Sequence, residues 1–448
     1  MSLQNTPSSE RLHIGFFGRR NVGKSSLVNR VTEQELSVVS DTLGTTTDPV
    51  QKAMELLPIG PVVIIDTPGY DDTGALGEKR VRKTKEILNR VDIAVLVTDE
   101  EVFANPVDRE LVQIFREKKL PYVICHNKSE SLPDFQANAF GIINDETQEI
   151  PAVLLPSMIH SQEEAAEAET DRAAGAKTLT KGTVEEKLLY GEIRVSALTN
   201  QNVYLLKALI GRLGKSVLET KNLLEGLIAP GDLFVLVIPV DSSAPKGRLI
   251  LPQQMVLAEI LNNHARAICC QPEELKDTIA LLNRDGENHI RLVITDSQAF
   301  KSVSAVVPRE VPLTSFSILM ARYKGFLTEA MKGVAAIETL QDGDRVLISE
   351  GCTHHRMCDD IGSFKIPNWL RKYTGKKLEF ETTSGHGFPE ELGTYKLIIH
   401  CGACMLNDRE VLFRMKQAQD QGVPFTNYGT CISFMNGILN RSTEMLGL

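Results

Sequence analysis

The stretch Gly18-Arg19-Arg20-Asn21-Val22-Gly23-Lys24-Ser25 decides the fold of the first part of the chain. It matches G-x-x-x-x-G-K-[ST], the pattern of a phosphate-binding loop, in which backbone N–H groups and a helix N-terminus converge on phosphate oxygens. The apolar run 12–17 (LHIGFF) before it predicts a buried strand, and residues 25–31 after it predict a helix. Because strand, loop and helix follow in the order that the motif requires, we expect Lys24 at the β- and γ-phosphates and Ser25 at Mg²⁺.

The composition is typical of a soluble protein with several domains. The chain has 448 residues, of which 42% are hydrophobic and 24% charged, and its formal net charge is −9. An acidic balance gives no general attraction to nucleic acid or to membranes. No apolar run approaches the ~18 residues of a membrane-spanning helix, and the first residues (MSLQNTPSSERLH) lack the pattern of a signal peptide. We therefore expect a cytoplasmic protein whose cysteines are free, metal-bound or redox-active rather than joined in structural disulfides.

Further elements of a nucleotide site follow the loop in order. The polar loop 44–48 (GTTTD) can supply a second hydroxyl to Mg²⁺. The apolar strand 62–65 ends at Asp66-Thr67-Pro68-Gly69, where Asp66 can reach Mg²⁺ through water and the Gly69 N–H can meet the γ-phosphate. More buried strands are predicted at 93–97, at 122–126 before Asn127-Lys128, and at 193–195 before Ser196-Ala197. Alternating strands and helices predict a doubly wound parallel sheet with its ligand at the carboxyl ends of the strands.

These motifs, spread over about residues 11–215, resemble the translation-factor-type GTPases of the Era, Der and MnmE group. The resemblance implies GTP and GDP as ligands, Thr46 as the Mg²⁺-binding threonine of the first switch, and a guanine site at Asn127-Lys128 backed by Ser196-Ala197. The nucleotide-binding residues it implies are Gly18, Asn21, Val22, Gly23, Lys24, Ser25, Ser26, Asn127, Lys128, Glu130, Ser196 and Ala197. The residues it implies for hydrolysis are Lys24, Thr46, Asp66 and Gly69, with Ser25, Thr46 and Asp66 serving Mg²⁺.

Two positions depart from that group. Glu130 stands where the guanine-reading motif has Asp, so its carboxylate lies one methylene further out and nucleotide selectivity could weaken. Tyr70 stands where Ras-like enzymes place a water-orienting Gln. Asn21 resembles the asparagine that binds K⁺ in this group; without the resemblance it reads equally well as a solvated loop amide. We expect slow hydrolysis that K⁺ or a partner stimulates.

A long connection, 129–192, interrupts the GTPase pattern. Its part 161–185 (SQEEAAEAETDRAAGAKTLTKGTVE) is rich in Glu, Ala, Thr and Gly and has few large apolar side chains. Such a composition cannot bury a core, so it predicts a disordered or partly helical surface insertion. A tolerated insertion is favoured over a site for a regulatory partner.

The sequence predicts an α/β protein of three domains. The P-loop GTPase domain spans 10–220, including the partly disordered insertion 129–192. A smaller parallel-sheet domain follows at 231–308, after the break Ala229-Pro230-Gly231-Asp232, and it lacks a second P-loop. Without candidate catalytic residues, its most economical role is assembly or dimerisation. A third parallel-sheet domain spans 312–448.

Three cysteines follow strands of the third predicted sheet. Cys352 comes after the strand 345–349, and Cys401-x-x-Cys404 comes after the strand 395–399. Strand ends of a parallel sheet meet at one edge, so the three thiols can share one metal, with His354 or His400 nearby. From this chemistry alone a [4Fe–4S] cluster, a zinc ion and redox-active or structural thiols all stay open.

The pattern Cys352-x-His354, a spacer and His400-Cys401-x-x-Cys404 behind a GTPase domain resembles the HydF family, the [FeFe]-hydrogenase maturation GTPases. The stretch Ala244-Pro245-Lys246-Gly247-Arg248-Leu249 is also similar to that family. The resemblance implies a [4Fe–4S] cluster on Cys352, Cys401 and Cys404, with His354, His400 or an outside group as fourth ligand. It also implies a homodimer that delivers a di-iron precursor to apo [FeFe]-hydrogenase and works with two radical-SAM maturases.

Two other readings compete with that one. A ribosome-assembly or tRNA-modifying GTPase with a zinc-binding accessory domain would carry an RNA-binding tail rich in Lys and Arg, and the last residues (NRSTEMLGL) are not such a tail. In a redox-sensing GTPase, Cys401 and Cys404 would form a reversible disulfide.

Overall fold

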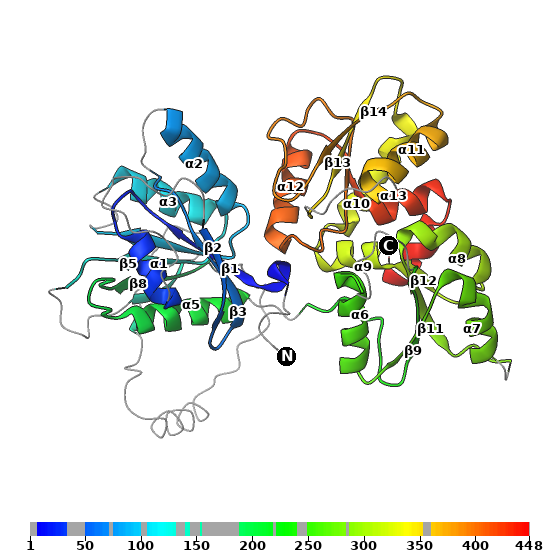
Figure 1. Cartoon of the computed structure of the whole chain (residues 1–448), viewed down its shortest axis with the longest axis horizontal. Helices are drawn as coiled ribbons and strands as arrows, with labels where there is room; N and C mark the ends of the chain where they lie inside the picture. Colours follow the sequence, from blue (N-terminus) through cyan, green and yellow to red (C-terminus); the bar gives the residue numbers. More distant parts are fainter. Residues whose placement is uncertain are drawn as a thin grey trace. The chain divides into compact units, whose positions relative to one another are not determined.

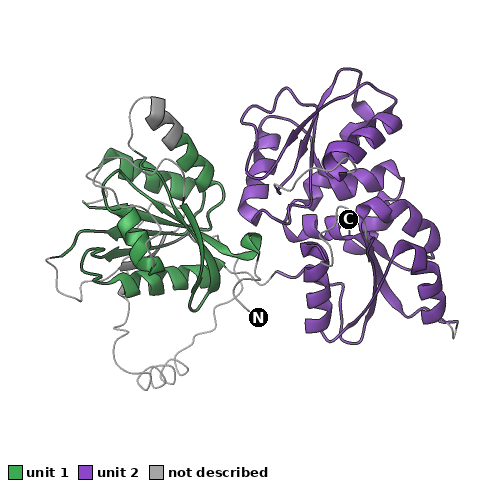
Figure 2. Cartoon of the chain, in the orientation of Figure 1, with its two compact units in different colours: residues 1–219 green, residues 220–448 purple. Residues whose placement is uncertain are grey.

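The computed structural model describes residues 7–33, 50–70, 75–99, 105–130, 139–143, 153–154, 188–217, 221–239, 249–283, 286–352 and 360–447. The predicted site residues Thr46 and His354, the insertion stretch 161–185 and most of the 244–249 stretch lie outside the described residues. The chain divides into two compact units, 1–219 and 220–448 (Figure 2).

Unit 1 is built on an eight-stranded sheet in the order β2-β3-β1-β4-β5-β8-β6-β7. Its central strands β3, β1, β4, β5 and β8 run parallel, whereas β2 and β6 run antiparallel to their neighbours. The strands are β1 Leu12–Phe17, β2 Val50–Leu56, β3 Gly60–Asp66, β4 Ile93–Thr98, β5 Tyr122–His126, β6 Ala139–Ile143, β7 Val153–Leu154 and β8 Leu188–Arg194. The parallel centre confirms the predicted P-loop fold.

In the described part of unit 1, helices cover both faces of this sheet (Figure 1). They are α1 Lys24–Thr32, α2 Ala75–Leu88, α3 Pro106–Glu117 and α5 Val203–Val217. Apolar residues of α1 and α5, such as Leu27 and Leu206, share one core with Ile14 of β1. Residues of α2 and α3, such as Ile87 and Phe115, share a second core with Ile65 of β3. Alternate residues of each buried strand therefore serve opposite faces.

Parts of this sheet differ from the sequence-based expectation. The edge strand β2 (VQKAMEL) alternates exposed and partly buried residues, and its polar positions hid the strand signal. Within the region predicted as a surface insertion, β6 (AFGII) pairs antiparallel with β8, Phe140 opposite Gly191. The last parallel strand also begins at Leu188 rather than at Ile193. Short apolar runs of this kind join a sheet only through their tertiary partners.

Unit 2 contains two four-stranded sheets, β10-β9-β11-β12 and β14-β13-β15-β16, and every pairing in them is parallel. The first comprises β9 Leu233–Val237, β10 Arg266–Cys270, β11 Ile290–Thr295 and β12 Leu313–Ser315, with α6 Leu251–Asn262, α7 Leu275–Leu282, α8 Phe300–Val306 and α9 Phe316–Tyr323. The second comprises β13 Arg345–Ser349, β14 Glu379–Thr383, β15 Leu397–His400 and β16 Phe425–Asn427, with α10 Leu327–Gly333, α11 Ile366–Thr374, α12 Asp408–Asp420, α13 Tyr428–Met435 and α14 Leu439–Thr443. Both predicted small parallel sheets are present.

The apolar stretch 313–319 begins as a strand but is mostly helix. Only Leu313–Ser315 pairs with β11, and α9 begins at Phe316 because the Ser315 side chain caps it, accepting a hydrogen bond from the Ile318 N–H at 3.2 Å. An N-cap serine ends the strand where apolar character alone would have extended it.

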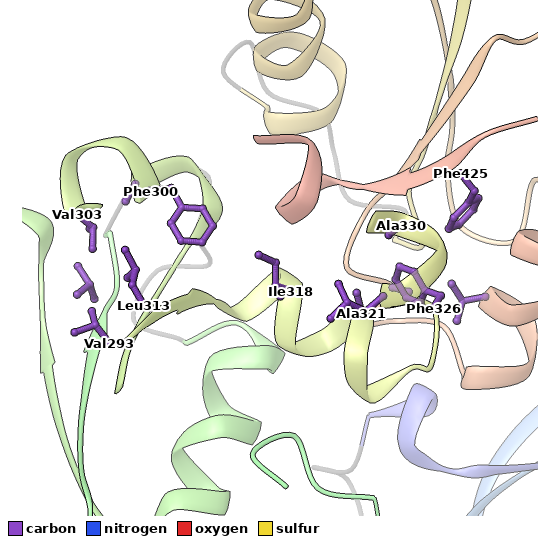
Figure 3. Close-up of a cluster of buried hydrophobic side chains, with 14 of the residues drawn as sticks. Val293, Phe300, Val303, Leu313, Ile318, Ala321, Phe326, Ala330 and Phe425 are labelled. Carbon is purple, nitrogen blue, oxygen red and sulfur yellow. The ribbon is translucent and has the colours of Figure 1, made fainter. Parts of the chain in front are cut away.

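One hydrophobic core serves both sheets of unit 2 (Figure 3). Phe300 and Leu313 come from the side of the first sheet, and Phe425 comes from the second. Ile318 of α9 and Phe326, which precedes α10, lie between them. The segment from α9 to α10 therefore joins the two sheets through packing as well as through the chain.

No helix in the part of the chain that the structure describes is long and apolar enough to cross a membrane.

Candidate functional site

The phosphate-binding loop depends on two glycines at close approaches. Gly18 has φ +142°, and a Cβ there would lie 2.2 Å from the carbonyl oxygen of Val97. Gly23 has φ +90°, precedes α1, and a Cβ there would lie 2.3 Å from Nδ2 of Asn127. Both contacts are too short for any side chain, so the glycines of the motif allow β4 and the guanine motif to pack against the loop.

The phosphate and Mg²⁺ residues come together at the end of β1 and β3. Lys24 is buried and its Nζ donates to the carbonyl oxygens of Gly18 at 3.0 Å and Arg19 at 2.6 Å. Ser25 Oγ donates to Asp66 Oδ2 at 2.6 Å. This serine hydroxyl and this carboxylate are the hard oxygen donors that Mg²⁺ prefers, so the residues present fit the ion.

The segment Asp66-Thr67-Pro68-Gly69, predicted to meet Mg²⁺ and the γ-phosphate, lies with Tyr70 against the loop. A Cβ on Gly69 would lie 3.2 Å from the backbone nitrogen of Arg20, and the Tyr70 N–H donates to the carbonyl oxygen of Gly18 at 3.3 Å. The Tyr70 ring is buried and its hydroxyl donates to Glu110 Oε1 at 2.8 Å. Burial, with the neighbouring Glu110, raises the pKa of Tyr70. The hydrogen bond to Glu110 therefore holds the Tyr70 hydroxyl against α3.

Of the predicted guanine-site residues, Asn127, Lys128, Glu130 and Ala197 line a pocket of about 810 Å³, which Gly23 and Ser26 also line, whereas Ser196 is not among its lining residues. Asn127 joins the two sides of the site, since its Nδ2 donates to the Val22 carbonyl at 2.9 Å and its Oδ1 accepts from the Ala197 N–H at 3.0 Å. Glu130 Oε1 accepts a hydrogen bond from Ser196 Oγ at 3.0 Å. Lys128 Nζ contacts Asp99 Oδ2 at 2.8 Å. The structure therefore brings together the residues that the motifs placed apart in the sequence.

Two arginines stabilise this site through contacts that no sequence motif predicted. Arg30 of α1 donates from Nε to the Ala197 carbonyl at 2.8 Å and from Nη2 to the Leu198 carbonyl at 3.2 Å. Arg19 of the loop contacts Asp99 at 2.8 Å and the buried Asp108 at 3.3 Å. Because Lys128 shares Asp99, one carboxylate links the phosphate loop to the guanine motif.

The cysteine loop lies where β13 and β15 end side by side, with Ser349 opposite His400. The Cys401 N–H donates to the Ser349 carbonyl at 2.9 Å. Cys401 Sγ accepts from the Gly351 N–H at 3.1 Å and from the Ala403 N–H at 3.4 Å. Burial raises the pKa of Cys401, and the two N–H groups directed at its sulfur oppose that increase because they stabilise the thiolate.

The three predicted cysteines interact electrostatically. Burial raises the pKa of Cys352 to about 12, and the charges of Cys401 and Cys404 add to the increase. Burial likewise raises the pKa of Cys404 to about 12. Three thiolates crowded in this way would need a cation to stay ionised, and a donor set of sulfur suits iron–sulfur ligation. Among the described residues, no group of three or more His, Cys, Asp or Glu is arranged to hold a metal ion.

Two histidines are candidates for the fourth ligand, and of these His400 lies among the residues that the structure describes. It is fully buried, its Nδ1 lies 2.9 Å from the Cys401 carbonyl and its Nε2 lies 3.2 Å from Arg414 Nη1. Burial and the Arg414 charge lower the pKa of His400 to about 3, so the ring is neutral. A neutral ring that donates from Nδ1 and accepts at Nε2 satisfies both contacts, and binding iron would require one of them to break.

Three family descriptions match the chain. Residues 223–325 match the hydrogen maturase F dimerization domain, and residues 328–445 match the hydrogen maturase F tetramerization domain. Residues 13–128 match the family described as 50S ribosome-binding GTPase. The two maturase matches account for all of unit 2 except its ends and a short link.

Curated relatives match about a quarter to a third of the chain. The tRNA modification GTPase MnmE of Desulforamulus reducens is 35% identical over 116 residues, which are 26% of this chain and 25% of that protein. GTPase Era of Clostridioides difficile is 33% identical over 131 residues, 29% of this chain and 43% of that one. The chain thus spans less than half the length of either relative. The solved structure of Aquifex aeolicus Era, at 19% identity, covers 56% of this chain and 65% of its own with a TM-score of 0.29, too low to support an argument.

Proposed function

Since the chain belongs to the hydrogen maturase F (HydF) family, we propose that it is a GTP-hydrolysing scaffold for [FeFe]-hydrogenase maturation. It holds a [4Fe–4S] cluster on Cys352, Cys401 and Cys404 and carries the precursor of the di-iron subcluster to apo-hydrogenase. The observation that carries this proposal is Cys401 at the junction of β13 and β15, where its sulfur accepts two backbone N–H groups and Cys352 follows directly after Gly351.

In this function the GTPase site binds nucleotide and the cysteine site binds metal. Lys24 neutralises phosphate charge, Ser25 and Asp66 hold Mg²⁺, and Thr46 completes that ion's ligands. Asn127, Lys128 and Glu130 face guanine, and Ser196 and Ala197 support it. When bound, the cluster supplies an iron–sulfur platform for the cargo; the role of the chain is to hold its thiolates in place.

Hydrolysis is slow and stimulated by K⁺ in this proposal. The Tyr70 hydroxyl donates its hydrogen bond to Glu110, so it does not orient the attacking water as a glutamine would. Asn21, with φ +63°, lies at the outer turn of the loop, where its side-chain oxygen can bind K⁺ beside the phosphates. Replacing K⁺ by Na⁺ should slow hydrolysis by the native chain and leave the rate of Asn21→Ala unchanged. Equal rates of the native chain in both salts would contradict the K⁺ site.

Oligomers and protein partners complete the proposal. The matches to a dimerisation and a tetramerisation domain support an assembly of at least two chains. The partners are apo [FeFe]-hydrogenase and two radical-SAM maturases, because a scaffold must receive its cargo before delivering it. The domain limits remain predictions. We assign nucleotide hydrolysis to residues 10–220, assembly to residues 231–308 and the cluster to residues 312–448.

Anaerobic purification and reconstitution test the proposal. We expect about four iron and four sulfide per chain, with the spectra of a [4Fe–4S] cluster. Cys352→Ser, Cys401→Ser and Cys404→Ser should each lose the cluster. Cys431→Ser is the matched control, because Cys431 is fully buried on α13 in the same part of the chain and belongs to neither motif. A colourless zinc protein, or a full cluster in Cys352→Ser, would refute the scaffold.

A further inference from the structure

Lys324, at the end of α9, is a lysine in an unusual place. Only 1% of its surface is exposed. Its Nζ donates to the Leu406 carbonyl at 2.9 Å and contacts Asp408 Oδ1 at 2.9 Å. Burying an ammonium group is energetically costly unless the group is paired, and here the Leu406 carbonyl and the Asp408 carboxylate are its partners. Both contacts lie on the segment that follows Cys404 by a few residues.

The cysteine loop lies along the face of α9 that ends at Lys324. A Cβ on Gly402 would lie 3.6 Å from Ser317 Oγ and 3.8 Å from Met320 Cβ. Ser317, Met320 and Lys324 are spaced three and four residues apart, so they share one face of the helix. Ile318 and Ala321 lie in the core that joins the two sheets (Figure 3). The helix thus anchors in that core and supports the loop from Gly402 to Leu406.

The carboxylate that Lys324 contacts has a second cationic partner. Lys221 Nζ contacts the other oxygen of Asp408, Oδ2, at 3.1 Å. Two ammonium groups therefore share one carboxylate, so this group of three side chains carries one more positive than negative charge. Cys404 itself packs against the hydrophobic cluster to which Leu319 and Met320 of α9 belong.

We propose that Lys324 is a positioning residue for the cluster site: it fixes the Cys401–Leu406 segment against α9 and compensates the negative charge of the thiolates and of the cluster they bind. The inference rests on the proposed function. It gives the end of the dimerisation segment, 223–325, a direct part in the chemistry of the segment 328–445, to which the cysteines belong.

The reduction potential of the reconstituted cluster tests this role in the full chain. Lys324→Met keeps the apolar stem and removes the charge, so its potential should be more negative than that of the native protein. Lys324→Arg should restore the native value. Lys221→Met is the matched control: Lys221 contacts the same carboxylate but is 41% exposed, and its loss should shift the potential less.

A second variant keeps the test decisive if Lys324→Met does not fold. Asp408→Asn removes the carboxylate and leaves both ammonium groups, so its potential should move in the opposite, positive direction. Asp408 is 30% exposed, which makes this substitution the milder one. A merely structural role of Lys324 would not produce shifts of opposite sign.

The outcomes separate this inference from the proposed function. A native protein that binds no iron and sulfide overturns both. A native cluster whose potential is unchanged in Lys324→Met and in Asp408→Asn overturns the role of Lys324 alone. Opposite shifts in these two variants, with a small shift in Lys221→Met, support it.

Discussion

Arg414 donates a hydrogen bond from Nη1 to Nε2 of His400 at 3.2 Å, and neither side chain is more than 1% exposed. The same guanidinium donates to the Gly385 carbonyl at 2.6 Å and to Glu410 Oε1 at 2.7 Å. One buried cation therefore ties the end of β15, directly before Cys401, to α12 and to the segment after β14.

Arg414→Met should lower the free energy of unfolding by about 3 kcal/mol, because it leaves the buried Glu410 carboxylate with His386 as its remaining partner and removes the hydrogen bond to the Gly385 carbonyl. Denaturant unfolding at neutral pH measures the loss. Lys416→Met is the matched control: Lys416 pairs with Asp420 on the same helix at the same spacing, but the two side chains are 66% and 58% exposed. The control should lose less than about 1 kcal/mol, and equal losses would contradict the argument.

Acid should weaken the same network through Glu410. Burial opposes ionisation of this carboxyl, but the hydrogen bond from His386 and the charge of Arg414 outweigh it and lower the pKa of Glu410 to about 2 from an ordinary 4.5. A pKa depressed in the folded state contributes stability that is complete above pH 4.5 and is lost as the pH falls toward 2.

The loss over that range should be on the order of 3 kcal/mol for this group. Unfolding titrations at several pH values should show a smaller acid dependence in Glu410→Gln than in the native chain. An identical acid dependence in the variant would show that Glu410 ionises in the folded protein as it does in the unfolded chain.

Gly23→Ala should weaken GTP binding without unfolding the protein. The added Cβ would meet Nδ2 of Asn127 at 2.3 Å and displace the residue that joins the phosphate loop to the base site. Losing the hydrogen bonds that Asn127 makes with Val22 and Ala197 costs about 1–3 kcal/mol, which corresponds to about 5- to 150-fold in affinity for GTP. Titration with a GTP analogue measures it.

Gly231→Ala provides the control for that substitution. Gly231 has φ +88°, close to the +90° of Gly23, but a Cβ there would meet nothing within 4 Å. It bears a similar backbone strain of about 1 kcal/mol without the collision. If both variants bind GTP like the native chain, the contact with Asn127 does not hold the site.

Glu130→Asp should sharpen the preference for GTP over XTP and ATP. Glu130 now accepts from Ser196 Oγ at 3.0 Å, and a shorter carboxylate restores the reach of the usual guanine-reading motif. Competition binding measures the ratio. Ser129→Ala is the control, because the Ser129 hydroxyl donates to the His126 carbonyl at 3.2 Å, so its loss leaves the hydrogen bond between Glu130 and Ser196 in place. Unchanged selectivity would mean that the extra methylene does not matter.

The sequence allowed prediction of those parts of the site that a fixed spacing creates. Residues 18–25 and Asn127 belong to motifs whose geometry is local, and Cys401 follows a strand whose end position is set by the sheet. Arg30 could not be predicted, because it contacts Ala197 across 167 residues of chain. Lys324 could not be predicted either, since nothing in a sequence distinguishes a buried lysine from a solvated one until the helices are packed.

The shared core of unit 2 has a consequence for how this protein can be divided. Thr314 of β12 donates to the Ser442 carbonyl near the end of the chain at 2.8 Å, and Phe326 packs against Phe425 with ring centroids 5.9 Å apart. A cut between the two maturase segments would therefore expose the interior of both halves. The cysteine loop is therefore not carried by a detachable module, because α9, which supports this loop at Gly402, is itself part of the core that joins the two sheets.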